Sequence, residues 1–322
     1  MSMREMATTL KQQNDGAGST TSVRAILNNF NFKVASQKLV PMLTPQHQQR
    51  RLEWALEHLN DVWSSRRVVR VDIDEKYFRI ARVGRSQRIY IPPTELLGDD
   101  EAEVVAEKPL SSKKQIPGVM FLAGVAPPDP ARGFDGKIGI FPCVQEVNQK
   151  IRSKFRNAGE IRREPTELNR VGFVAMLKTQ LCPAMVAACP WARKFIVQMD
   201  NAGGHGSRGS GMATTLGMLN PWGAQQRPPI SFLTQPARSP EMNALDLGAW
   251  WSLETEVAKV KADPLLNMPT AEIIMRAVKI AWDQNWDATS KLREIFKSKT
   301  VVMGEVAKQR GGAISLPHGR KS

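Results

Sequence analysis

The sequence predicts an α/β fold in which acidic residues from distant segments meet at one edge of a sheet. The segment Val68–Asp74 alternates apolar and polar side chains, as a half-buried strand does. The apolar strand Lys194–Met199 ends in Asp200, and Ser239–Asp246 is typical of a helix start that carries an acid. Carboxylates gathered in this way suit hard divalent cations, which promote phosphodiester chemistry.

The charge of the chain favours a polyanionic partner. The 322 residues include 45 Lys and Arg against 31 Asp and Glu, which gives a net charge of +14. Because neutralising phosphates with basic side chains releases counterions, nucleic acid is the expected partner. Charge alone leaves open the alternative of a basic protein with an unrelated partner or with a charged tail.

Cysteine usage and hydropathy indicate the compartment. Cys143, Cys182 and Cys189 are odd in number and too few for a disulfide framework, so we expect buried thiols in a reducing compartment. Their spacing does not suit zinc, and the four histidines do not cluster with them. No apolar run approaches the roughly 18 residues of a membrane span, so we expect a soluble, intracellular protein without membrane contact.

The N-terminal elements predict a partial helix-turn-helix. Arg4–Leu10 is typical of a short helix, Lys11–Ser19 of a turn, and Val23–Phe30 of a second, groove-reading helix, although a frayed helical hairpin fits the same periodicity. Thr44 then precedes a proline that starts a helix running to about Val62. We expect its charges, which include Arg50 and Arg51, on a solvated face, with DNA contact as the alternative.

From Val68 the pattern changes to strands, followed by alternating helices and strands. Expected strands are Val68–Asp74, Phe78–Val83, Arg88–Ile91, Val119–Val125, Lys137–Phe141, Lys194–Met199 and Ile230–Leu233. Expected helices are Glu164–Leu181, with Val171, Val174, Leu177 and Leu181 as its core stripe, one from Ser239 toward Lys259, Thr270–Gln284 and Thr289–Lys308. Gly203–Pro228 predicts a flexible surface loop rather than a phosphate-cradling loop, and Gly311–Ser322 predicts a basic tail.

Three acidic motifs share their residues with one family of enzymes. Asp74–Phe78 is close to the pattern Asp-Glu-Lys-Trp-Phe, and Gln198–Ala202, followed by His205, is close to Gln-Gln-Asp-Asn-Ala with a nearby His. Gln235–Gly248 contains Ser-Pro-Glu-Met-Asn-Ala-Leu-Asp-Leu-Gly and is the most specific of the three. In these motifs, and over nearly its whole length, the chain resembles plant-type mariner-like DNA transposases.

The resemblance implies an RNase H-like catalytic core, a mixed sheet flanked by helices, with the all-aspartate triad Asp74, Asp200 and Asp246. These aspartates would be both the catalytic residues and the ligands of two Mg²⁺ or Mn²⁺ ions about 3.5–4 Å apart. The implied activity is endonuclease cleavage at the terminal inverted repeats of a transposon and strand transfer into target DNA, by a homodimer in the nucleus. Asn201 and His205 would orient the ligands or contact DNA, with loop capping as an equal alternative.

The resemblance also leaves choices open. Asp72 shares a strand face with Asp74 and fits on geometry alone, whereas the motif favours Asp74. Glu75 and Glu241 fall outside the motif's acidic positions and are expected to be structural. The 45 residues between Asp200 and Asp246 exceed the family's usual spacing, and the excess falls in the Gly-rich stretch, where insertion is mild in its cost.

We therefore expect four regions. Residues 1–37 would form the partial helix-turn-helix, 38–66 a linker and helix, 67–262 the RNase H-like catalytic domain, and 263–322 C-terminal helices and a basic tail. Relatives carry two helix-turn-helix units, and this chain begins inside what resembles the second, which predicts an N-terminal truncation. A catalytically silent, transposon-derived DNA-binding protein is the main alternative, and a stand-alone RNase H-like nuclease is the third.

Overall fold

The computed structural model describes residues 42–61, 63–65, 67–79, 118–148, 159–200, 211–260 and 270–314. The chain from Leu43 onward forms one compact unit. The predicted helix-turn-helix of residues 1–37, the strand Arg88–Ile91, and the residues Asn201 and His205 lie outside the described residues. The four-region division therefore stays a prediction.

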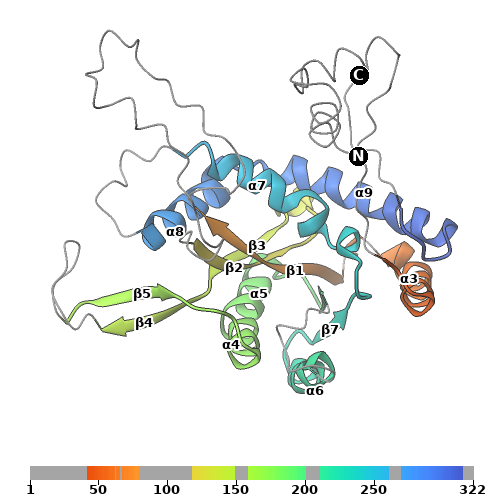
Figure 1. The fold of residues 1–322 in the computed structure, drawn as a ribbon, viewed down its shortest axis with the longest axis horizontal. Helices are drawn as coiled ribbons and strands as arrows, with labels where there is room; N and C mark the ends of the chain where they lie inside the picture. Colours follow the sequence, from red (N-terminus) through yellow and green to blue (C-terminus); the bar gives the residue numbers. More distant parts are fainter. Residues whose placement is uncertain are drawn as a thin grey trace, which may run out of the picture. The chain divides into compact units, whose positions relative to one another are not determined.

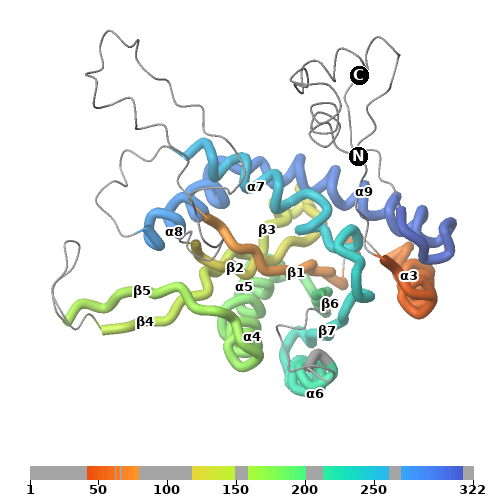
Figure 2. The backbone as a smooth tube through the Cα atoms, viewed as in Figure 1, coloured from red at the N-terminus to blue at the C-terminus, as the bar shows by residue number. Residues whose placement is uncertain are grey.

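A five-stranded mixed sheet forms the centre of this unit. Its order is β3-β2-β1-β6-β7, with β1, β2 and β3 antiparallel to one another in turn and β6 and β7 parallel to β1. The strands are β1 (Val68–Arg79), β2 (Gly118–Val125), β3 (Lys137–Pro142), β6 (Lys194–Met199) and β7 (Ile230–Thr234). Figure 2 shows β1 running through the middle of this unit. The five strands predicted over Val68–Asp74, Val119–Val125, Lys137–Phe141, Lys194–Met199 and Ile230–Leu233 are confirmed. Phe78 lies in β1 rather than in a separate strand.

Two helical layers cover the sheet, as Figure 1 shows. One layer is α4 (Arg170–Met176), the π-helical turn η6 (Leu177–Leu181), α5 (Cys182–Ala188) and α6 (Gly211–Ala224). The other is α3 (Pro45–His58), the π-helical turn η9 (Leu245–Ala249), α7 (Trp250–Val257), α8 (Thr270–Ile280) and α9 (Ala288–Lys308). Short turns η1 (Leu59–Asp61), η5 (Pro130–Arg132), η8 (Pro240–Met242) and η11 (Ala281–Asn285) complete the described helical segments. This mixed sheet flanked by helices confirms the predicted fold class.

The alternation along β1 divides the core into two parts. Val69, Val71 and Ile73 are buried against the α4–α6 layer, whereas Phe78 is buried against the α7–α9 layer. Successive strand side chains point to opposite faces, so Asp72 and Asp74 share the second face with Phe78. The central strand thus presents its acids to the C-terminal helices.

The helix predicted over Glu164–Leu181 begins later and ends later than expected. The antiparallel hairpin of β4 (Val144–Asn148) and β5 (Ile161–Pro165) takes up its first residues, a hairpin that the sequence did not predict. The helix begins at Arg170, capped by Asn169, and Val171 in its first turn is 75% exposed rather than in the core. The helix accommodates Pro183 by forming the π turn η6 just before it, because proline lacks the amide hydrogen of regular α-helical bonding.

The prediction of a flexible loop over Gly203–Pro228 is wrong for Gly211–Ala224, which form α6. Gly223 reflects close packing in this helix, because a Cβ there would collide with the carbonyl oxygen of Ile230 in β7. Asn220 ties the helix to the same strand, accepting from the Phe232 amide at 2.8 Å and donating to its carbonyl at 3.2 Å. Glycine at position 223 therefore allows α6 to approach β7 closely.

One helix among the described residues has the length and mean hydropathy, 1.5, of a membrane span, contrary to the expectation that none would. It is the continuous helix from Arg170 to Ala188. Phe173, Leu177 and Leu181 on this helix are buried in the core beneath the sheet. Packing against the sheet accounts for its apolar character.

Leu122 tests the core between the sheet and the α4–α6 layer. It lies in β2 and is fully buried. We expect Leu122→Ala to lower the free energy of unfolding by about 2–5 kcal/mol, through lost burial and a residual cavity. Urea denaturation of the full chain measures the change. The same substitution at Leu56, 62% exposed on α3, should change it by less than about 0.5 kcal/mol; equal losses would contradict this assignment of the core.

Candidate functional site

Parallel pairing of β1 and β6 brings two of the predicted aspartates together. Asp72 lies opposite Gln198 in this register. Carried two residues further, the same register sets Asp74 in β1 against Asp200, which directly follows β6. Asp200 also raises the pKa of Asp74 by charge repulsion, which agrees with this proximity.

Two hydrogen bonds from the turn before η9 bring the third aspartate to the same strand. The Asn243 side chain donates to the carbonyl oxygen of Ile73 at 2.9 Å, and the Ala244 amide donates to Asp72 Oδ2 at 2.8 Å. Asp246 follows two residues later, in the first turn of η9. Its charge is the second largest contribution to the raised pKa of Asp74. The three aspartates thus lie near enough for their charges to act on one another.

Asp74 lies in an environment that disfavours its negative charge. Burial, and then the charge of Asp246, raises its pKa to about 8, although the Trp250 indole N–H donates to Asp74 Oδ2 at 2.7 Å and opposes the shift. The pKa of Asp246 is raised to about 6, first by partial enclosure of its carboxyl and then by Asp200, while Lys76 lowers it. Much of the Asp246 side chain remains exposed.

These carboxylates fit a hard cation by their chemistry. Oxygen ligands are those that Mg²⁺ and Mn²⁺ prefer, and a cation would relieve the repulsion that raises both pKa values. In the part of the chain that the structure describes, no three His, Cys, Asp or Glu side chains already stand as a metal-binding group. Binding of a cation would displace the protons that Asp74 and Asp246 retain at raised pKa values.

Asp72, the alternative to Asp74, is occupied by other partners. Its side chain is 2% exposed and lies within 2.6 Å of the Lys299 ammonium on α9. The same Oδ2 atom accepts from the Ala244 amide. These contacts give Asp72 a structural role and favour Asp74 as the residue that faces the other acids.

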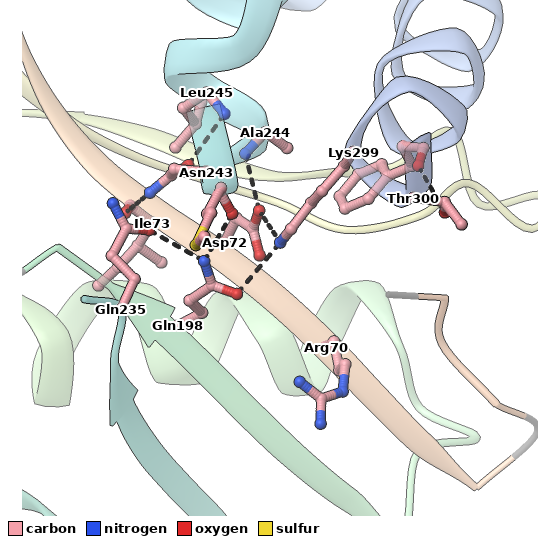
Figure 3. A network of polar contacts seen from close by, with 12 residues as sticks. Arg70, Asp72, Ile73, Gln198, Gln235, Asn243, Ala244, Leu245, Lys299 and Thr300 are labelled. Atoms are coloured by element: carbon pink, nitrogen blue, oxygen red, sulfur yellow. Dashed lines mark hydrogen bonds and ion pairs between the residues drawn. The ribbon is translucent and has the colours of Figure 1, made fainter. Parts of the chain in front are cut away.

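A chain of buried polar side chains continues from Asp72 across the sheet (Figure 3). Lys299 also donates to Gln198 Oε1 at 3.1 Å. The Gln198 amide nitrogen donates to Gln235 Oε1 at 2.9 Å and to the Met242 carbonyl at 2.8 Å. Gln235 in turn donates to the Ser239 carbonyl at 3.2 Å. These hydrogen bonds connect the strand that precedes Asp200 with the segment that precedes Asp246.

Arg51 anchors the third motif from outside, and its predicted place on a solvated face is wrong. The side chain is 1% exposed. It pairs with Glu241 at 2.6 Å and donates to Ser239 Oγ at 2.9 Å. It also donates to the carbonyl oxygens of Arg238, Gly311 and Gly312. Glu241 is structural, as predicted, and Ser239 binds this guanidinium instead of capping a helix.

Sequence reasoning did not identify Lys299 or the hydrogen-bonding role of Trp250. A signal for Lys299 is present in α9. Leu292, Phe296, Met303 and Val306 follow a three-four spacing on its buried face, and Lys299 occupies the position between Phe296 and Met303. A charged residue inside such an apolar stripe indicates a buried partner of opposite charge.

The cysteines take no part in this site chemistry. Cys143, Cys182 and Cys189 are free and buried, as predicted. Burial raises the pKa of each thiol to about 12. They remain protonated near neutral pH and are therefore poor metal ligands and nucleophiles there.

Comparison with known proteins gives two independent likenesses. Residues 1–60 match the family model HTH_Tnp_Tc3_2, described as "Transposase". A comparison with curated proteins returned no match.

The fold resembles solved structures of the Mos1 transposase. The Mos1 mariner paired-end complex with Mn matches with a TM-score of 0.55 at 15% identity, over 97% of this chain and 79% of that one. The paired-end complex with the left transposon end matches at 0.54 and 16%, over 97% and 79%. The strand transfer complex matches at 0.53 and 14%, over 98% and 79%. Residues 1–60 thus resemble a transposase family in sequence, and nearly the whole chain resembles the Mos1 mariner transposase in fold.

The raised pKa of Asp74 predicts how the stability of the metal-free protein changes with pH. An unfolded Asp loses its proton near pH 3.8, whereas the folded protein keeps it to about pH 8. The folded state binds more protons across this window, so raising the pH destabilises it. We expect Asp74→Asn to raise the thermal midpoint above that of the wild type, by an amount that grows from about pH 5 to pH 8.

Thermal melts in the presence of a chelator measure this difference. Asp283→Asn, a change at a partly exposed acid in η11, is the matched control and should show no such growth. A difference between Asp74→Asn and wild type that stays constant with pH would contradict the charge repulsion at this site.

Proposed function

We propose that the chain is a mariner-like DNA transposase in which Asp74, Asp200 and Asp246 hold two Mg²⁺ or Mn²⁺ ions. The observation that carries the proposal is the convergence of the three acidic motifs: β1 and β6 pair in the register that aligns Asp74 with Asp200, and the turn before Asp246 is bonded to β1. The transposase fold and the match of residues 1–60 support it.

The side chains around the site have different proposed roles. The three carboxylates would bind the ions, whose chemistry is to activate a water or a 3′-hydroxyl and to stabilise the leaving oxygen. Trp250 holds one oxygen of Asp74 through its indole N–H and so orients the other. Lys76, paired with Glu254 at 3.4 Å, places a positive charge close enough to Asp246 to lower its pKa. Asn201 and His205 are proposed to orient the ligands or contact DNA.

The proposed partner is DNA. The solved Mos1 structures include a paired-end complex with a transposon end and a strand transfer complex, and the net charge of +14 suits the same kind of ligand here. We therefore propose cleavage at terminal inverted repeats and joining to target DNA, by a homodimer acting in the nucleus. The alternative is a silent DNA-binding protein that keeps the aspartates without cutting.

A nicking assay separates these two functions. With purified chain, Mn²⁺ or Mg²⁺ and DNA that carries the flanking inverted repeats, we expect strand cleavage that a chelator abolishes. Asp200→Ala should reduce the rate by at least about a thousandfold, because a lost ligand removes the cation that stabilises the transition state.

Asp283→Ala, at the ion-paired acid of η11, is the matched control and should cut as the wild type does. DNA binding without cutting by wild type would favour the silent protein. Equal cutting by wild type and Asp200→Ala would rule out the proposed triad.

A further inference from the structure

We propose that Lys299 is a positioning residue that sets the relative placement of the three acid-bearing segments. This inference rests on the proposed function. Lys299 lies on α9, 227 residues from Asp72 and 101 from Gln198 in sequence, and its ammonium contacts both side chains. Figure 3 shows it reaching from the helix to the space between β1 and β6.

Each segment is held two residues before its acid. Asp72 precedes Asp74, Gln198 precedes Asp200, and the Ala244 amide, bound to Asp72, precedes Asp246. In a strand, residues two apart lie on the same face about 6.6–6.8 Å apart. A shift of Asp72 or Gln198 would therefore be passed directly to the carboxylate that follows it.

The contacts leave the network little freedom to rearrange. Lys299 is 4% exposed and Asp72 is 2% exposed, so each charge depends on the other for compensation. The Gln198 amide nitrogen is fixed by Gln235 and Met242, which directs Oε1 toward Lys299. Asp72 Oδ2 accepts from both Lys299 and Ala244. One ammonium thus joins β1, β6 and, through Asp72, the turn before η9.

Metal affinity distinguishes positioning from simple support of the fold. Residues that orient metal ligands typically change affinity by about 10–100-fold when they are removed. We expect Lys299→Met in the full chain to weaken Mn²⁺ binding at least about tenfold, measured by titration with electron paramagnetic resonance of free Mn²⁺. Lys297→Met, on the exposed side of the same helix, is the matched control and should bind as the wild type does.

Lys299→Met alone leaves the buried Asp72 charge unpaired, which could unfold the protein. A double variant keeps the test informative in that case. Lys299→Met with Asp72→Asn removes both charges and keeps an oxygen for the Ala244 amide. We expect its thermal midpoint to exceed that of Lys299→Met while its Mn²⁺ binding stays weaker than that of the wild type, because Gln198 Oε1 has still lost its donor.

The outcomes separate this inference from the proposed function. Wild-type Mn²⁺ affinity in a folded Lys299 variant would overturn the positioning role and leave the proposed function standing. A folded wild type that neither binds Mn²⁺ nor nicks DNA would overturn both. Weakened Mn²⁺ binding in the folded double variant, with Lys297→Met unchanged, is the result that supports it.

Discussion

The buried ion pair between Lys299 and Asp72 is the contact on which the arrangement of the acids depends. Two charges taken out of water are tolerated only when they meet closely and their remaining hydrogen-bonding capacity is used. Here that condition brings α9 against β1, and it requires Gln198 and the Ala244 amide to complete the set. The requirement to satisfy buried polar groups thus joins segments that share no local sequence relationship.

The central sheet separates two kinds of interior. Toward α4–α6 the buried side chains of β1 are the apolar Val69, Val71 and Ile73, and packing there supplies burial without polar groups to satisfy. Toward α7–α9 the same strand presents Asp72, Asp74 and Lys76, which make polar contacts, and then Phe78, which packs in the apolar core. The two faces of β1 therefore have different roles: one contributes apolar burial, and the other holds charged side chains in fixed positions.

Local patterns predicted the parts of this structure that depend on local physics. The alternation of β1, the apolar run of β6 and the periodicity of α9 each fix an element from neighbouring residues, and the motifs indicated which aspartates to examine. The glycines and proline of α6 obscured a helix because their reason, close approach to β7, lies outside the segment. Arg51 and Lys299 were missed for a related cause. Whether a charge is buried depends on partners 187 to 261 residues away for Arg51 and 101 and 227 for Lys299.

Arg51 also has a mechanical consequence. It lies on the first described helix of the unit and binds the carbonyls of Gly311 and Gly312, just beyond the last one. One guanidinium therefore connects α3, the first described helix, with the segment that directly follows α9. The same guanidinium donates to Ser239 and pairs with Glu241, both within the third motif. A displacement of α3 would therefore be passed through the Arg51 side chain to the segment that leads to Asp246.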